Sequence, residues 1–148
     1  ICFAIGKIGK NTGDSACTKA LIQQVEIEED KQNLSSLFDL LADGPKLTDH
    51  EAETIMRFLG DPRWLVRHAT IQALSNAASS RPEEAVLRHL AETTDKFDQI
   101  YCHVALRNIG TLKSLPLLEQ GRKSRKRDVK TSAELAIQAI RERNETEE

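Results

Sequence analysis

The chain has 148 residues, a length typical of a single domain, and 30% of its residues are charged while 4% are aromatic. Its apolar fraction of 39% is too high for a disordered chain of near-zero net charge, and the net charge of −2 makes it neither a polyanion nor a polycation. The many Leu, Ala and Ile residues favour a helical protein.

Nine helices are predicted from apolar residues at helical spacing and from the residues that separate them. No window alternates apolar and polar residues over the length of a strand, so we expect no sheet. The helices are expected near residues 1–9, 14–29, 31–43, 48–59, 62–79, 82–94, 97–109, 112–120 and 126–144.

Capping residues set the expected ends of these helices. Thr48 with Glu51, and Ser80 with Glu83, have the spacing of a capping box. Asp61-Pro62 offers an N-cap acceptor followed by Pro at the first helical position. Left-handed C-caps are expected at the glycines that follow apolar runs, namely Gly9, Gly44, Gly60, Gly110 and Gly121.

A short pattern of small and branched apolar residues recurs along the chain. The block that begins at Ala4 aligns with the one at Ala105, and looser copies begin at Ser36, Ala73 and Ala136, with spacings of 32, 37, 32 and 31 positions. This period predicts an all-α fold, a right-handed α-α superhelix (solenoid) of four to five helical pairs. We expect one repeat domain over residues 1–144, which opens at Ile1 as a fragment would, and a polar tail at 145–148.

The segment from Asp61 to Leu74 resembles the HEAT repeat, and in particular the short HEAT-like repeats of the phycobilisome (PBS) lyase type. Its Asp-Pro, Val-Arg and Ala-Leu pairs at helical spacing carry the resemblance, and residues 105–118 resemble the turn and second helix of the same unit. The repeat around Ser36 departs from the pattern because it lacks the Val-Arg pair. The resemblance implies an armadillo-like helical scaffold and no single function.

The most favoured function is that of a non-enzymatic scaffold or adaptor that binds another protein. The second helix of each pair is expected to line a concave face with mixed charge, which suits a charged peptide or protein partner. The residues predicted to contact this partner are Glu53, Arg57, Glu84, Arg88 and Lys113. The sequence leaves the identity of the partner and the oligomeric state open.

Charge is unevenly distributed along the chain. Residues 26–61 hold ten acidic and three basic side chains, whereas residues 101–143 hold ten basic and four acidic ones. A solenoid keeps sequence order in space, so we expect a dipole along its long axis. The densest basic patch comprises Arg122, Lys123, Arg125, Lys126, Arg127 and Lys130. It is either a solvated loop or a contact for nucleic acid or a phosphate ligand, without aromatic residues that could stack on bases.

Enzymes are also built on such repeats, and three classes of them require residues that can be looked for in this sequence. A di-iron centre like that of deoxyhypusine hydroxylase needs several His-Glu pairs, and only His50-Glu51 is present, with Glu51 suited to the capping box. HEAT-like alkylpurine DNA glycosylases need aromatic residues in a groove, whereas Trp64 and Tyr101 are expected on the outer layer. No residue marks a bilin site of the kind a bilin lyase subunit needs. We therefore predict no catalytic residue, metal or cofactor, and a DNA glycosylase or a bilin lyase subunit stays only as the least favoured alternative.

The cysteines and histidines give weaker signals. Cys2, Cys17 and Cys102 are expected to be buried free thiols of a cytoplasmic protein, because their number and spacing suggest no disulfide framework. Cys102 and His103 point about 100° apart on a helix, so Cys102 is expected in the core and His103 at the surface. His68 and His89 could approach each other within one helical pair. No apolar run reaches the ~20 residues that span a bilayer, and no membrane contact is expected.

Overall fold

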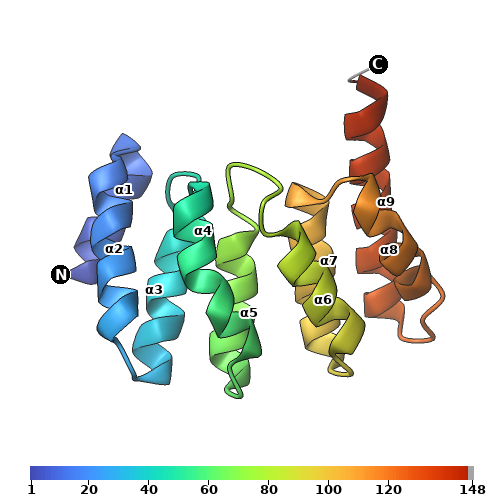
Figure 1. Ribbon diagram of the computed structural model, residues 1–148, viewed down its shortest axis with the longest axis horizontal. Helices are drawn as coiled ribbons and strands as arrows, with labels where there is room; N and C mark the ends of the chain where they lie inside the picture. The colour runs from blue at the N-terminus through green and yellow to red at the C-terminus, as the bar shows by residue number, and fades with distance from the viewer. Residues whose placement is uncertain (147–148) are drawn as a thin grey trace.

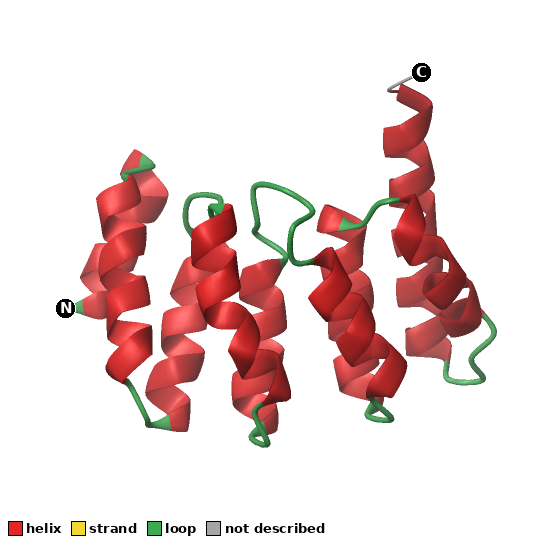
Figure 2. Cartoon of the chain, viewed as in Figure 1, coloured by secondary structure: helices red, strands yellow, loops and turns green. Residues whose placement is uncertain are grey.

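The computed structural model describes residues 1–146, and these form helices, loops and one isolated β-bridge (Figure 2). The nine helices expected from the sequence are present in this part of the chain, and the expected lack of a sheet is confirmed for it. They are α1 (Cys2–Thr12), α2 (Ser15–Ile27), α3 (Lys31–Asp43), α4 (Asp49–Met56), α5 (Trp64–Leu74), α6 (Glu83–Glu92), α7 (Lys96–Ile109), α8 (Leu115–Arg122) and α9 (Arg127–Thr146). Two 3-10 helices, η1 (Arg57–Gly60) and η2 (Leu112–Ser114), follow α4 and precede α8.

The helices lie side by side in two layers that follow the order of the chain along the long axis (Figure 1). The first-helix layer consists of α1, α3, α5, α7 and α9, and each of these helices packs directly on the next one in the layer. The second-helix layer consists of α2, α4, α6 and α8, whose members contact one another less extensively. The acidic segment 26–61 and the basic segment 101–143 consequently lie towards opposite ends of the molecule.

Side-chain hydrogen bonds between neighbouring helical pairs join residues that are about 30 to 35 positions apart in the sequence. Arg67 Nε donates to Asp98 at a separation of 31 residues, and His103 lies 29 residues from its partner Ser132. Asn76 Nδ2 donates to the Leu41 carbonyl 35 residues earlier in the chain. The recurrence of these separations agrees with the period in the low thirties that the sequence predicts.

The buried face of α5 matches its sequence pattern, but the helix is shorter than expected. Val66, Ala69, Ala73 and Leu74 are all buried, as their helical spacing predicts. The helix ends at Leu74 rather than near residue 79, because the chain turns there and residues 76–78 pair with Leu47. The Leu47 N–H donates to the Asn76 carbonyl at 2.9 Å, and the Ala78 N–H donates to the Leu47 carbonyl at 2.8 Å.

Of the three expected capping arrangements, one is confirmed and two are wrong, although α6 itself begins at Glu83, close to the expected residue 82. The Glu51 N–H donates to Thr48 Oγ1 at 3.2 Å, and the Glu51 carboxylate accepts from the Thr48 N–H at 2.9 Å, which completes a capping box. The Asp61 carboxylate binds the backbone and guanidinium of Arg63, so α5 begins only at Trp64. The Glu83 carboxylate, expected to cap α6 with Ser80, is instead buried against the turn that follows α7.

The five glycines expected to adopt a left-handed conformation do not do so. Gly13, with φ of 68°, is the glycine with positive φ in the described chain, and it ends α1. Gly9 and Gly121 lie inside helices, where the missing side chain permits close packing. A Cβ atom on Gly9 would lie 2.9 Å from Cys17 Cβ, and one on Gly121 would lie 2.8 Å from the His103 ring.

Two further features of the described chain bear on its organisation. No helix in residues 1–146 is long and apolar enough to cross a membrane. Helix α9 extends to Thr146, so the first two residues of the expected polar tail are helical. The remaining tail residues, 147–148, lie outside the described residues.

Gly121→Ala tests the packing between α8 and α7. The new methyl group would overlap the buried His103 ring, so we expect the free energy of unfolding to fall by about 1–3 kcal/mol in chemical denaturation. Gly60→Ala is the matched control, because a Cβ atom there meets nothing within 4 Å, and its stability is expected to stay within about 0.5 kcal/mol of the parent. Equal stability of the two variants would contradict the packing described here.

Candidate functional site

A buried carboxylate joins three helices near the start of α7. Asp98 is 2% exposed and accepts hydrogen bonds from side chains on α5, α6 and the loop that follows α6. Arg67 Nε lies 3.1 Å from Oδ2, His68 Nε2 lies 2.5 Å from Oδ1, and His89 Nε2 lies 3.1 Å from Oδ2. The Thr93 hydroxyl donates to Oδ2 at 3.2 Å. We call these five residues the Asp98 cluster.

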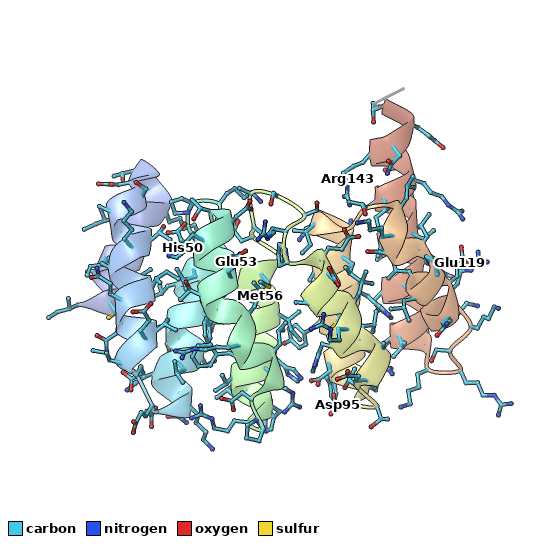
Figure 3. The ribbon with its side chains drawn as sticks, viewed as in Figure 1. His50, Glu53, Met56, Asp95, Glu119 and Arg143 are labelled. Carbon is cyan, nitrogen blue, oxygen red and sulfur yellow. The ribbon has the colours of Figure 1, made fainter. Side chains whose placement is uncertain are left out.

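Local structure brings these side chains together. Asp95 is the N-cap of α7 and accepts from the backbone N–H groups of Phe97 and Asp98 at 2.8 and 2.9 Å, which fixes Asp98 in the first turn. Arg67 is held from the other side, because its guanidinium also donates to the backbone carbonyls of Asp61 and Pro62. Figure 3 places Asp95 at the turn between α6 and α7. The cluster therefore joins the end of one helical pair to the start of the next.

The Asp98 carboxylate is ionised at neutral pH. Burial acts to raise its pKa, but the hydrogen bonds from Arg67 and His68, together with the positive charge of Arg67, outweigh burial and hold the pKa of Asp98 below its ordinary value. The guanidinium of Arg67 thus has a buried counter-charge, and every polar atom of the carboxylate is occupied. This arrangement makes the cluster a rigid connection between α5, α6 and α7.

Two members of the cluster, together with the neighbouring Asp95, resemble the donor set of a metal site. Ligand atoms of His68, Asp95 and Asp98 lie within 4.8 Å of one another, and imidazole with carboxylate oxygen is a donor set that zinc accepts. The Asp98 carboxylate, however, is already bound by the guanidinium of Arg67, whose permanent positive charge would face any cation placed there. The residues therefore fit a hydrogen-bonded joint between helices better than they fit a metal centre.

The sequence had suggested only part of this cluster. His68 and His89 were expected to approach each other, and both contact Asp98. Asp98 could not be predicted as their partner, because it lies on α7 in the next helical pair. It is not at a short, regular spacing from either histidine in the sequence. The available signal was the acidic N-cap Asp95, which starts α7 at Lys96 and places Asp98 in its first turn.

Aromatic side chains lie directly beside the cluster on the first-helix layer. Trp64 is 62% exposed and Phe97 is 56% exposed, and they occupy the first turns of the neighbouring helices α5 and α7. The Trp64 ring lies 5.7 Å from the His68 ring, which stacks on the Tyr101 ring at 4.5 Å. We call Trp64, Phe97 and Tyr101 the aromatic platform. The Trp64 and Tyr101 rings both contact His68 of the Asp98 cluster, so these two rings are held in place, while Phe97 lies under the ammonium group of Lys96.

The charged residues predicted to contact a partner are exposed, and some of them share one surface. They lie on α4, η1, α6 and η2 and comprise Glu53, Arg57, Glu84, Arg88 and Lys113. Glu84 and Lys113 line a groove of about 480 Å³. Arg88 lies 3.7 Å from Glu84, and Glu53, which Figure 3 shows on α4, is paired with Arg81 at 2.5 Å. Several of these charges are therefore neutralised within the chain.

The basic patch surrounds the loop between α8 and α9. All six of its members are exposed: Arg122, Lys123, Arg125, Lys126, Arg127 and Lys130. Arg122 pairs with Glu119 at 2.9 Å, whereas the other five form no ion pair within residues 1–146. Their charge is therefore available to an anionic group in solution.

The adjacent Cys102 and His103 are both buried, which corrects one expectation. Cys102 lies in the core as predicted, and burial raises the pKa of its thiol far above the ordinary value. His103 was expected at the surface but is 1% exposed, because α9 packs on α7 and Ser132 Oγ lies 2.8 Å from His103 Nδ1. Cys2 and Cys17, expected to be buried, are partly exposed free thiols.

Comparison of the sequence with models of known protein families gave no match. Comparison with curated proteins gave no match either. The geometry of the site alone therefore carries the functional argument.

Asp98→Ala tests whether the cluster holds the helices together. It leaves the buried guanidinium of Arg67 without its carboxylate, so we expect a loss of about 3 kcal/mol in the free energy of unfolding. The control is Asp128→Ala, which removes a 70%-exposed carboxylate 3.7 Å from Lys96 and is expected to cost less than about 0.5 kcal/mol. A loss below about 1 kcal/mol for Asp98→Ala would show that the cluster is not a structural joint.

His103 gives stability a specific pH dependence. Burial lowers the pKa of His103 from 6.5 to about 4 in the folded chain, so between these values the unfolded state binds the extra proton. Stability is therefore expected to fall as pH drops from 6.5 to 4, by about 3 kcal/mol from this residue. Urea denaturation across this range should show a shallower loss for His103→Gln. Parallel curves for the variant and the parent would contradict the assignment.

Proposed function

We propose that this chain is an armadillo-like α-solenoid scaffold of HEAT-like helical pairs that binds another protein. The observation that carries the proposal is the exposure of Trp64 and Phe97 on neighbouring first-layer helices. Large aromatic side chains are enriched among the residues that dominate binding energy at protein interfaces. Large aromatic side chains that stay exposed at the same end of two packed helices are typical of a surface that a partner covers.

The support under the aromatic platform favours binding. His68 stacks on Tyr101, lies against Trp64 and is bonded to the buried Asp98, so these two rings contact a side chain that cannot change rotamer freely. A partner that contacts a surface already ordered in this way loses little conformational entropy on the side of the scaffold. The exposed Asp95 and the partly exposed Lys96 directly precede Phe97 in the sequence, and they would add polar contacts at the rim of the interface.

The second-helix layer, with the adjoining η1 and η2, is the second surface that we propose contacts the partner. Its exposed charges at Glu53, Arg57, Glu84, Arg88 and Lys113 would orient a charged partner more than they would add affinity. The basic patch around Arg125 would act in the same way over a longer distance, since its five unpaired cations attract acidic partners. In this reading the platform anchors the partner and the charged surfaces steer it.

A comparison of two double variants tests this division of roles. We expect Trp64→Ala with Phe97→Ala to weaken binding of a protein partner, identified by crosslinking from position 97, by about a hundredfold, because two aromatic anchors are lost. Arg57→Glu with Arg88→Glu is expected to weaken it by about tenfold or less, mainly through slower association. Both sets of side chains are exposed, so thermal unfolding should confirm that each variant remains folded.

The outcomes separate the alternatives. Loss of binding only in the charge-reversed variant would show that the second-helix layer, and not the aromatic platform, supplies most of the binding energy. Unchanged affinity in both variants, measured by surface plasmon resonance, would reject the proposed surfaces.

A further inference from the structure

The end of the molecule formed by α1, α2 and α3 carries an apolar groove of about 680 Å³. Two helices supply its apolar lining. Ile1, Cys2 and Phe3 at the start of α1 form one side, and Leu37 and Leu40 of α3 form the other. Phe3 is 72% exposed, and Ile8 on the same helix is more than half exposed. Exposed apolar side chains that gather around a groove, rather than lying singly, indicate a site that is covered by something.

Acidic residues line the rim of this groove. Glu28 follows α2, and hydrogen bonds from the backbone N–H of Asp30 and neighbouring groups lower the pKa of its carboxyl. Asp39 lies on α3 and forms no ion pair within the described residues, while burial and the nearby Asp43 raise the pKa of its carboxyl. Asp43 is itself paired with Lys10 at 2.9 Å, so Asp39 is the carboxylate at this rim that a partner's cation would neutralise.

The opposite end of the molecule is different in character. The groove there, of about 460 Å³, is lined mainly by charged and amide side chains of α9 such as Glu134, Gln138 and Arg141. The apolar, acidic groove is therefore a property of the α1–α3 end and not of an exposed helix face in general. The side of the groove that faces α3 shares this charge, because residues 26–61 carry a strong excess of acidic side chains, whereas Lys7 and Lys10 of α1 line the adjoining groove.

We propose that this groove binds a basic amphipathic α-helix of a partner protein. The inference rests on the proposed scaffold function and names the class of segment that one surface would take. The apolar floor fits a stripe of Leu, Ile or Phe at positions i, i+3, i+4 and i+7, and the rim at Glu28 and Asp39 fits Lys or Arg beside that stripe. Charge complementarity excludes an acidic helix from the same position.

A helix suits the groove better than an extended segment does. The walls are themselves helices, and Leu37 and Leu40, one turn apart on α3, form an apolar floor between them on which the side chains of a second helix can pack. A helix satisfies its own backbone hydrogen bonds, whereas an extended chain would bury N–H and C=O groups against Phe3 and Leu40 without partners.

Selection from a displayed library of random 16-residue peptides on the immobilised chain tests the proposal. We expect enrichment of peptides with apolar residues at helical spacing and flanking Lys or Arg. Fluorescence anisotropy of an enriched peptide should show about tenfold weaker binding to Asp39→Lys and several-fold weaker binding to Asp39→Asn. Phe3→Ser should weaken binding at least as much as Asp39→Lys. Glu92→Lys, a charge reversal at an exposed residue of α6, is the matched control and should bind as the parent does.

The same measurement distinguishes this inference from the aromatic platform. Peptide binding should be unchanged in the variant that lacks Trp64 and Phe97, even if that variant loses its protein partner. The inference is overturned if selection yields no binder, if the enriched peptides are acidic or lack helical spacing, or if Asp39→Lys and Phe3→Ser bind normally. It is also overturned if sedimentation shows that the parent chain dimerises and that Phe3→Ser abolishes the dimer, because the groove would then belong to a second copy.

Discussion

Each helix of this molecule relies on its neighbours for burial, and this dependence organises everything else. Helix α5 is buried only because α3, α4 and α7 cover it, and none of the pairs encloses an apolar core by itself. Hydrogen bonds between residues 29 to 36 positions apart connect the successive units. Asp98 is the most connected of these joints, since it binds side chains from α5, α6 and the loop before α7. Surface side chains that pack on such a joint are held in place by it, as Trp64 and Tyr101 are by His68 and Asp98.

The positions of the helices could be predicted from the sequence, because the spacing of apolar residues and the capping and turn residues between helices are local properties. The ends of the helices were less predictable wherever a polar side chain near the end forms hydrogen bonds with a residue outside its own helix. Asp61 could have capped α5, but the guanidinium of Arg63 binds its carboxylate and delays the helix until Trp64. Glu83 could have completed a capping box, but Thr111 and Ser114 bind it across the boundary between units. Local rules fail at these places because tertiary contacts compete for the same polar atoms.

The candidate site was predictable only in its exposed parts. The charged side chains on the second helices could be assigned to the surface from helical spacing, and they are exposed. The position of Asp98 between His68 and His89 depends on how far α7 is shifted relative to α5, which no single-helix pattern encodes. The burial of His103 has the same origin, since the face of α7 that meets α9 is set by the stacking of whole units. Sites formed between repeats therefore need the structure to be recognised.

The separation of charge along the molecule gives its two ends different chemistry. The acidic end combines unpaired carboxylates with an apolar groove, so desolvation there would strengthen attraction for a cationic side chain beside an apolar one. The basic patch at the other end has unpaired cations around a short loop, so its attraction for anions stays exposed to solvent and is screened by salt. The aromatic platform lies between the two ends, where neither charge dominates. Affinity at the groove should consequently resist salt better than any contact of the basic patch, because apolar burial is insensitive to the screening that weakens exposed ion pairs.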